Sequence, residues 1–478
     1  SVPPSLHSLH SLQLINSSRT KTRRFLTCLL QRGMVIRDID TSPFWLKIDG
    51  KWVHVDESVM RAHPGGSAIT TYRNKEATTV FQTFHGGSIT ASKWLAKLKE
   101  ESKDNQPDIK DTEEVLKGDE TINMGTFDIS AEKADEIAKA FDKLRLDLRK
   151  EGYFQSDKLW YLRKVIEPIG MICLAVYLQL VHQQYILAAL LMGLAWQQLG
   201  WYMHECCHQQ VFKTPYYNDL LSYFTGNLLQ GFSSAAWKEQ HNIHHAATNV
   251  LGRDGDLDLL PFWATVVQDL KVCDNWVLRM LPYQHIYWTV MLPLLRLSWL
   301  SGSISFVVGM PANYYDVYRR KAAYEQPLLA LHWMLVTYQL YLLPDYTTRI
   351  TFFFVSQLLG GWLIAHVVTY NHYSTVKFPY NARILSNYPC LQIYTTRNMQ
   401  PSPAIDWLWG GLNYQIEHHL FPTMPRHSLP KVMPRVKDFC KEHDIPYLVD
   451  DYFTGWRLGV EQFANVARVA ERKVKSIF

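Results

Sequence analysis

The sequence lacks the patterns that mark disulfide-stapled, zinc-finger and nucleic-acid-binding proteins. Its seven cysteines are an odd number at scattered positions, and none forms a CxxC pair. No run of lysine and arginine interleaves with aromatic residues, and the net charge of +5 is modest. These absences exclude a disulfide framework and argue against a nucleic-acid partner. No internal repeat is evident, which argues against a repeat architecture.

Long apolar segments occupy the central and C-terminal parts of the chain instead. Four of them approach the roughly 20 residues that a helix needs to cross the hydrocarbon core of a membrane. They form two hairpins, and the segments are 166–181, 185–203, 327–343 and 350–368. Two further apolar stretches, 216–237 and 285–308, are interrupted by Gly, Pro, Asn or Arg296. We therefore expect four transmembrane helices and two interfacial or re-entrant helices.

Basic residues indicate how these helices lie in the membrane. Arg163 and Lys164 precede the first hairpin and Arg319 to Lys321 precede the second, whereas the turn of the first hairpin carries no Lys or Arg. Because basic loops face the cytosol, this pattern places both chain ends in the cytosol. The basic excess of the chain would then face anionic lipid headgroups.

Three histidine clusters lie at the predicted cytosolic ends of these segments. They read His204-Glu-Cys-Cys-His208, His241-Asn-Ile-His244-His245 and Gln415-Ile-Glu-His418-His419. A spacing of three or four residues puts imidazoles on one face of a helix, close enough to share a metal ion. Seven clustered histidines are too many for one ion, so the pattern predicts two metal ions with further ligands from elsewhere.

The missing ligand is most simply sought near the end of the fourth span. We favour His372, with Asn371 acting directly or through water. His366 is an alternative that would otherwise be a buried polar residue of the span, and His332 and His285 are weaker candidates.

Other polar residues lie in or beside the clusters. Cys206 and Cys207 are soft ligands in principle, but the imidazoles already supply a nitrogen-rich site, and we do not expect thiolate ligation. Glu205, Glu239 and Glu417 would either orient imidazoles or be solvated. We expect the acidic loop of Asp254, Asp256 and Asp258 to be a solvated cytosolic face.

A small N-terminal domain carries a second kind of histidine pair. A strand at 44–48, a tight turn at Asp49-Gly50 and a returning strand at 52–55 precede His63-Pro-Gly-Gly66, and His85 follows 22 residues after His63. Two such histidines are spaced to fill both axial positions of a haem iron, which favours electron transfer over oxygen binding. An electron donor fused to a metal site in turn favours a redox metal over zinc. The alternative is two surface histidines in a loop-rich module.

The remaining segments complete the domain division. Residues 1–43 contain no acid before Asp38 and resemble a transit peptide, but we favour a disordered leader or a non-native extension upstream of Met34. A charged linker then leads to an amphipathic stretch, 131–148, that we expect to pack beside the membrane domain. The domains would be 1–43, 44–120 (haem domain and linker) and 121–478.

Specific motifs in this chain resemble two known families. His63-Pro-Gly-Gly, Ala77-Thr78 and Phe84-His85 resemble the core of cytochrome b5, which implies that His63 and His85 ligate a b-type haem. The whole chain from about Met34 resembles the front-end branch of membrane fatty acid desaturases, which joins a cytochrome b5 domain to HxxxH, HxxHH and QxxHH boxes.

Stretches such as Trp237-Lys-Glu-Gln-His241 and 407–415 are similar to nematode acyl desaturases of Δ5 type, with Δ6 as the near alternative. Two features depart from the pattern: the Glu-Cys-Cys spacer of the first box and the first 33 residues.

The resemblance implies a multidomain fold, with a small α+β haem domain and an all-α membrane domain of four transmembrane helices under a cytosolic histidine-box cap. It implies cis desaturation at Δ5 of C20 polyunsaturated acyl chains (dihomo-γ-linolenate to arachidonate, and the n-3 equivalent to eicosapentaenoate). Catalysis would use O2, two non-haem irons, the b-type haem and electrons from NADH through cytochrome b5 reductase. The partners would be that reductase, an acyl-CoA or phospholipid substrate and membrane lipid. The protein would lie in the endoplasmic reticulum membrane. The implied metal site comprises His204, His208, His241, His244, His245, His372, Gln415, His418 and His419, of which the histidines of the three boxes are catalytic.

Two rival readings remain open at this point. One is a sphingolipid desaturase or lipid hydroxylase with the same metal chemistry. The other is a non-catalytic membrane haem protein, which would need only His63 and His85.

Overall fold

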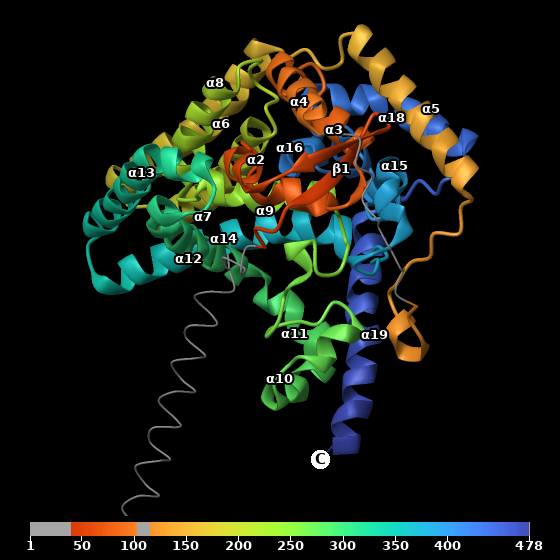
Figure 1. The fold of residues 1–478 in the computed structure, drawn as a ribbon. Coiled ribbons are helices and arrows are strands. Elements are labelled where there is room, and N and C mark those ends of the chain that lie inside the picture. The colour runs from red at the N-terminus through yellow and green to blue at the C-terminus, as the bar shows by residue number, and fades with distance from the viewer. Residues whose placement is uncertain (1–39, 103–114, 478) are drawn as a thin grey trace, which may run out of the picture.

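The computed structural model describes residues 40–102 and 115–477. The expectation for the leader, 1–43, therefore lies outside the described residues except at 40–43, as does that for part of the charged linker. The described chain forms a small N-terminal α+β region, a set of long helices and a cap of shorter elements (Figure 1).

The N-terminal region is built on a three-stranded sheet of order β2-β1-β3. Strand β1 (Phe44–Ile48) pairs antiparallel with β2 (Lys51–Val55) through a turn in which Asp49 and Gly50 both have positive φ, and β3 (Lys75–Glu76) pairs parallel with β1. The alternate residues Phe44, Leu46 and Ile48 are buried against the surrounding helices. Those helices are α2 (Glu57–Ala62), the 3-10 helix η1 (Gly66–Tyr72), α3 (Thr78–His85) and α4 (Ile89–Glu101).

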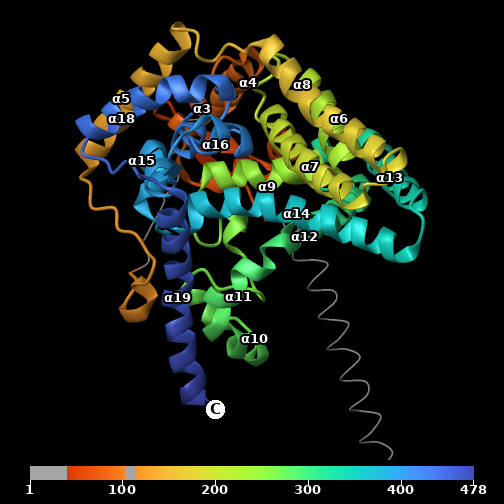
Figure 2. The ribbon, with the colours of Figure 1, turned by 180° about the vertical axis from the view of Figure 1, so that it is seen from behind.

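Two long helical hairpins form the membrane-type part. Helices α6 (Lys158–Leu180) and α7 (Tyr185–Cys207) form the first, and α13 (Asp316–Tyr341) and α14 (Tyr346–Tyr373) form the second. The hairpins lie side by side in both views (Figures 1 and 2). Helices α7 and α14 approach so closely that a Cβ on Gly193 would lie 2.8 Å from the carbonyl oxygen of Ser356.

Three segments of the described chain are long and apolar enough to cross a membrane: Tyr185–Cys207, Asn275–Ala312 and Tyr346–Tyr373. Helices α7 and α14 are therefore candidate membrane spans, as expected, whereas α6 and α13 are not apolar enough to count as candidates. The reason in α6 is its charged first half, which holds Arg163, Lys164 and Glu167. The expectation of a membrane-type helical domain is thus confirmed, whereas the expected count of four spans is not.

The segment Asn275–Ala312 is apolar enough to cross a membrane, but it is not one straight helix. It is divided into α10 (Asn275–Met280), η6 (Leu281–Tyr283), α11 (Gln284–Met291), η7 (Leu292–Leu294), α12 (Leu295–Gly309) and η8 (Met310–Ala312). Each of the three 3-10 turns contains a proline, which lacks the N–H that a continuous helix requires. The stretch predicted at 216–237 is likewise divided, into α8 (Pro215–Ser222), the π-helical η3 (Tyr223–Gln230) and the start of α9 (Ser234–Ala246).

A cap of short elements covers one end of the hairpins. It comprises α5 (Ala131–Lys150), η4 (Gly255–Leu257), η9 (Arg383–Ser386), α15 (Tyr388–Tyr394), α16 (Pro403–Leu408), α17 (Gln415–Leu420), η10 (Arg426–Ser428), α18 (Leu429–Glu442), and the parallel pair β4 (Asn398–Met399) and β5 (Val449–Asp450). The 3-10 helix η5 (Val267–Lys271) packs against α10 instead, and η2 (Gly118–Thr121) contacts η5 through the Glu120–Lys271 ion pair. The chain ends in α19 (Tyr452–Ile477), which projects with α10 and α11 away from the hairpins (Figure 2).

Helix α5 is the amphipathic helix expected at 131–148. Its buried residues Ile137, Phe141 and Leu148 belong to the core of the cap rather than contacting the long hairpins. The Phe141 ring stacks on Phe421 of the cap with ring centres 5.5 Å apart. The helix thus packs beside the membrane domain as expected, on its cap rather than on the long hairpins.

Candidate metal centre

The ends of four helices bring the histidine clusters together. His204 lies in the last turn of α7 and His208 caps that helix, while His372 lies in the last turn of α14. Helix α9 carries the second cluster and α17 the third. Because each long helix continues past its apolar stretch into its histidines, the side chains converge where the hairpins meet the cap.

Five imidazoles form a first group. They belong to His204, His208, His241, His245 and His418, and one nitrogen of each lies within 4.8 Å of those of the others. The Nε2 atoms of His204, His208 and His418 are buried and have no hydrogen-bond partner. Buried nitrogens with no partner, converging on a single point, fit a bound metal ion.

Three imidazoles form a second group beside the first: His244, His372 and His419. The Nε2 atoms of His244 and His372 are 3.3 Å apart, and the side-chain amide of Gln415 lies 2.9 Å from the His372 Nε2. The Oε1 atom of Gln415 is buried without a partner. Since the two ends of an amide exchange by a half-turn of the side chain, Gln415 fits as an oxygen ligand of the second group.

The adjacent histidines of the second and third boxes belong to different groups, whereas His204 and His208 of the first box both belong to the first group. His244 belongs to the second group and His245 to the first, and His419 and His418 divide in the same way. Successive residues on an α-helix are rotated by about 100°, so neighbouring imidazoles cannot easily reach the same ion. Each adjacent pair would therefore supply one ligand to each of two neighbouring metal ions.

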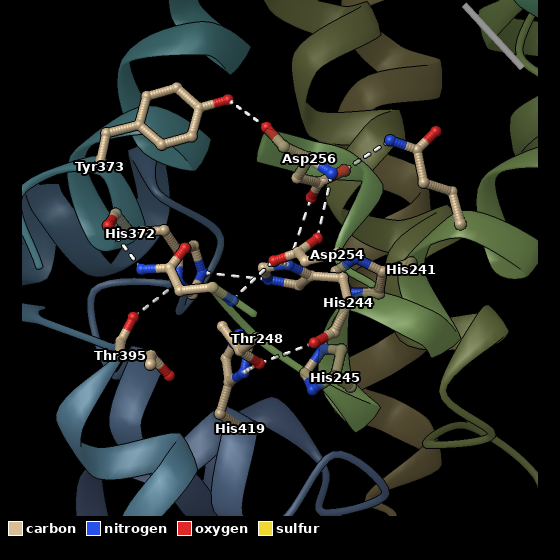
Figure 3. Close-up of polar contacts among 12 residues, drawn as sticks. His241, His244, His245, Thr248, Asp254, Asp256, His372, Tyr373, Thr395 and His419 are labelled. Carbon is tan, nitrogen blue, oxygen red and sulfur yellow. Dashed lines mark hydrogen bonds and ion pairs between the residues drawn. The ribbon is translucent and has the colours of Figure 1, made fainter. Parts of the chain in front are cut away.

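Polar groups behind the second group orient its imidazoles (Figure 3). The Nδ1 of His244 lies 2.9 Å from Oδ2 of Asp254, and the Nδ1 of His372 lies 3.1 Å from the Thr395 carbonyl oxygen. The Nδ1 of His419 lies 2.9 Å from Oε1 of Gln392. Each contact engages Nδ1 and leaves Nε2 to face the metal position, as is usual for metal-binding histidines.

The electrostatics of the two histidine groups suit neutral nitrogen ligands. Burial, together with the neighbouring histidines, holds the pKa values of His208, His241, His245 and His418 well below their usual range. His244 differs: burial acts to lower its pKa, but the carboxylates of Asp254 and Asp256 outweigh burial and raise it to about 9. A metal ion at its Nε2 would displace that proton.

Several residues considered from sequence lie away from both groups. His366 contacts the Tyr452 hydroxyl through Nδ1 and stacks on Trp456, with ring centres 4.8 Å apart. The Nδ1 of His332 lies 2.8 Å from the Leu228 carbonyl oxygen. Asn371 differs: it neighbours His372, its amide nitrogen donates to the Leu412 carbonyl oxygen, and its buried Oδ1 has no hydrogen-bond partner. The remaining three, His285, Cys206 and Cys207, also lie outside the groups formed by the described residues.

The carboxylates take other positions than expected. Glu205 pairs with Arg426 at 2.7 Å, and Glu417 accepts from Asn398 and from the Tyr447 hydroxyl. Glu239 accepts from Ser67 of the N-terminal region and from the Tyr318 hydroxyl. The acid that does orient an imidazole is Asp254, which is fully buried, so the expectation of a solvated acidic loop was wrong for this residue.

The N-terminal histidine pair forms a separate site. The ring centres of His63 and His85 are 6.1 Å apart. Two iron–nitrogen bonds of about 2 Å, plus about 1 Å from each nitrogen to its ring centre, add up to a separation of about 6 Å. The Nδ1 atoms lie 3.3 Å and 3.2 Å from the carbonyl oxygens of Gly66 and Phe81, which leaves both Nε2 atoms free to ligate. Burial lowers the pKa of His63 to about 4, so its imidazole is neutral. The pair fits the axial ligands of a haem.

Comparison with known proteins agrees with this architecture. The family model for fatty acid desaturases matches residues 182–450, more than half of the chain. The chain is 58% identical to the Delta(5) fatty acid desaturase fat-4 of Caenorhabditis elegans, over 93% of this chain and 100% of that protein. It is 46% identical to the Delta(6)-fatty-acid desaturase fat-3 of the same organism, over 92% and 100%, and 35% identical to the Delta(8)-fatty-acid desaturase of Euglena gracilis, over 87% and 94%.

The chain therefore belongs to the fatty acid desaturase family, a family of oxidoreductases. The resemblance to front-end desaturases drawn from the histidine boxes is confirmed.

The residues that sequence reasoning missed are those behind the ligands. Gln392 lies in the short helix α15 and Thr395 caps it, with no histidine box nearby in the sequence, and nothing in their local sequence marks them. Asp254 did carry a signal, because it follows His244 by only ten residues in an acidic loop.

Proposed function

We propose that this protein is a front-end desaturase that inserts a cis double bond at Δ5 of C20 polyunsaturated acyl chains. The observation that carries the proposal is the 58% identity to a Delta(5) desaturase across nearly the whole of both chains. Convergence of eight histidines into two adjacent groups supports it, since this arrangement suits a two-metal centre.

The reaction must remove hydrogen from methylene groups that have no acidic proton, so general base catalysis cannot perform it. Its balance is R–CH2–CH2–R′ + O2 + 2 e⁻ + 2 H⁺ giving R–CH=CH–R′ + 2 H2O. Two irons held by the histidine groups would supply the activation of O2 that this chemistry needs. Imidazole ligands are compatible with iron, and a redox requirement disfavours zinc.

The chain's own residues then have distinct tasks. The imidazoles hold nitrogen donors at both metal positions, with His372 and Gln415 completing the second, and the contacts of Asp254, Gln392 and Thr395 keep Nε2 of their histidines turned inward. His63 and His85 would hold a b-type haem that delivers electrons singly, received from NADH through cytochrome b5 reductase. Burial of the histidines keeps bulk water from the ligands.

The membrane arrangement belongs to the same proposal. Helices α6, α7, α13 and α14 would form four spans of the endoplasmic reticulum membrane, with both termini and the histidine cap in the cytosol. The absence of Lys and Arg from the turn at 182–184 and the basic residues before each hairpin support this orientation. Double-bond position would be set by the distance between the anchor of the acyl carboxyl end and the metals.

Product analysis in a host without polyunsaturated lipids tests the proposal. Cells expressing the chain would be fed dihomo-γ-linolenic acid or linoleic acid, and new double bonds would be located by mass spectrometry. Arachidonic acid from the first substrate alone is the expected result, and His245→Ala is the inactive control because it removes a ligand of the first group.

The 46% identity to a Delta(6) desaturase makes Δ6 activity the second candidate. γ-Linolenic acid from the linoleic acid culture would assign that activity instead. A hydroxylated product, or desaturation of sphingoid bases alone, would move the assignment to another member of the superfamily.

A further inference from the structure

A partly buried contact joins the N-terminal region to the helix that carries the second histidine box. The carboxylate of Glu239, on α9, accepts from the backbone N–H of Ser67 at 3.1 Å and from the Ser67 hydroxyl. Its other oxygen accepts from the hydroxyl of Tyr318, at the start of α13. Glu239 thus connects three segments that lie far apart in the sequence, and its partners are not imidazoles.

The fit around this contact is close. Gly66, the first residue of η1, lies so near to Glu239 and Tyr318 that a Cβ at this position would overlap both side chains. The positive φ of Gly66 turns the chain directly from the His63 loop into η1. The Gly66 backbone therefore lies directly against the side chains of Glu239 and Tyr318.

Two further hydrogen bonds hold η1 in the same place. The hydroxyl of Tyr72 donates to the carbonyl oxygen of Ala246 at 2.9 Å, one residue after His245. The guanidinium of Arg253 donates to the carbonyl oxygen of Thr71. The two ends of η1 thus contact opposite ends of the histidine-bearing part of α9, and Figure 1 shows the N-terminal region lying against this helix.

The contact also links the two candidate cofactor sites by a short route. The Nδ1 of His63 contacts the Gly66 carbonyl oxygen, Ser67 follows Gly66 and bonds Glu239, and Glu239 lies two residues before His241 of the first metal group. The route from one ligand set to the other contains only Gly66, Ser67, Glu239 and the intervening backbone.

We propose that Glu239 is a positioning residue that holds the haem domain on α9 in the pose required for electron transfer from haem to metal centre. This rests on the function proposed above. Each transfer oxidises one ferrous haem to the ferric state and delivers one electron, and re-reduction by NADH through the reductase between two transfers supplies the two electrons of the balanced reaction.

The test compares Glu239→Gln, Ser67→Ala and Tyr318→Phe with wild type in the full-length, haem-loaded and iron-loaded protein. Glu100→Gln is the matched control, because Glu100 is an exposed acid of α4 in the same N-terminal region. Three quantities are measured: the rate of haem reduction by NADH and reductase, the rate of substrate-dependent haem reoxidation in O2, and hydrogen–deuterium exchange of the amides of η1.

In Glu239→Gln we expect reoxidation to slow at least tenfold and exchange in η1 to rise, while haem reduction and the haem and iron contents stay at wild-type values. Ser67→Ala and Tyr318→Phe should change the same two quantities in the same direction. The reoxidation rate of the Ser67→Ala/Glu239→Gln double variant should be no lower than that of Glu239→Gln alone, because both changes break the same contact. The Glu100→Gln control should match wild type.

Other outcomes separate the ideas. Unchanged reoxidation and unchanged exchange in Glu239→Gln would overturn the proposal. Loss of iron with unaltered exchange would also overturn it, by assigning Glu239 to the metal ligands. If wild-type protein binds no haem or forms no desaturated product, the failure lies with the proposed function, whereas faster exchange of η1 in the variants would still establish the docking contact.

Discussion

Replacement of Asp254 tests whether a buried carboxylate tunes the second metal position. Asp254 is completely buried, and its two oxygens receive three donors. Oδ2 accepts from His244 Nδ1 at 2.9 Å and from the Asn249 N–H at 2.8 Å, and Oδ1 accepts from the Asp256 N–H at 3.0 Å.

The structure predicts a graded effect for two substitutions. In Asp254→Asn the remaining oxygen can keep the two donors that share Oδ2. The main loss is therefore the negative charge of the carboxylate beside His244. We expect metal affinity at the second position to fall about tenfold, the lower end of the range for partners of ligating histidines. Asp254→Ala removes all three acceptor contacts, and a fall of about 100-fold, or about 2.8 kcal/mol, is expected.

The assay is an Fe(II) titration of metal-free protein with non-haem iron counted per chain, alongside the initial rate of product formation. The five-histidine group does not contact Asp254. At limiting iron each variant should therefore still bind one ion tightly at the first position, while the second position stays empty. Product formation should fall in parallel, because the reaction needs both positions.

Asp258→Asn is the control, since Asp258 is the exposed acid of the same loop. Equal iron affinity in wild type, Asp254→Asn and Asp254→Ala would refute the argument that this carboxylate orients and polarises His244. Loss of both ions together would show instead that the substitution collapses the loop.

Three other predictions follow from particular contacts. His372→Ala should lose the second iron and all activity, whereas His366→Ala should keep both irons, because His366 contacts Tyr452 rather than the metal groups; iron counting distinguishes them, and equal iron loss would contradict the assignment. Glu205→Gln leaves the Arg426 charge buried without its partner, so unfolding free energy should fall by about 3–5 kcal/mol, seen as a lower thermal midpoint, and an unchanged midpoint would show that the pair contributes little. His63→Ala should abolish the haem absorption band and retain non-haem iron, so a wild-type haem spectrum would refute axial ligation by this residue.

Much of the architecture was predictable because it depends on local patterns. The hairpin β1–β2 follows from alternating apolar residues around Asp49-Gly50, and α7 and α14 follow from long apolar runs. Interruption of the stretch 285–308 follows from its proline, which cannot donate a helical hydrogen bond. Helix α5 was predicted as a helix, but its packing partner was not, since the cap residues that cover Phe141 lie some 250 residues or more away in the chain.

The candidate site divides in the same way. The spacing of the histidine boxes, the identity of the preferred additional histidine, His372, and the pairing of His63 with His85 all came from sequence, since helix geometry and motif resemblance depend on near neighbours. The roles of the acids did not. Glu205, Glu239 and Asp254 all lie close to histidines in sequence, yet only Asp254 contacts an imidazole.

The sequence by itself determined which histidines are the candidate ligands of metal and haem, because the chemistry of imidazole and the helical repeat are properties of short segments. Only the tertiary structure decided how the histidines divide into two groups of five and three. It also decided that the Glu239 carboxylate faces the N-terminal region rather than the metals. The direction of a side chain near a helix end is set by what the rest of the chain packs against it, and that partner lies too far along the sequence for any local pattern to record.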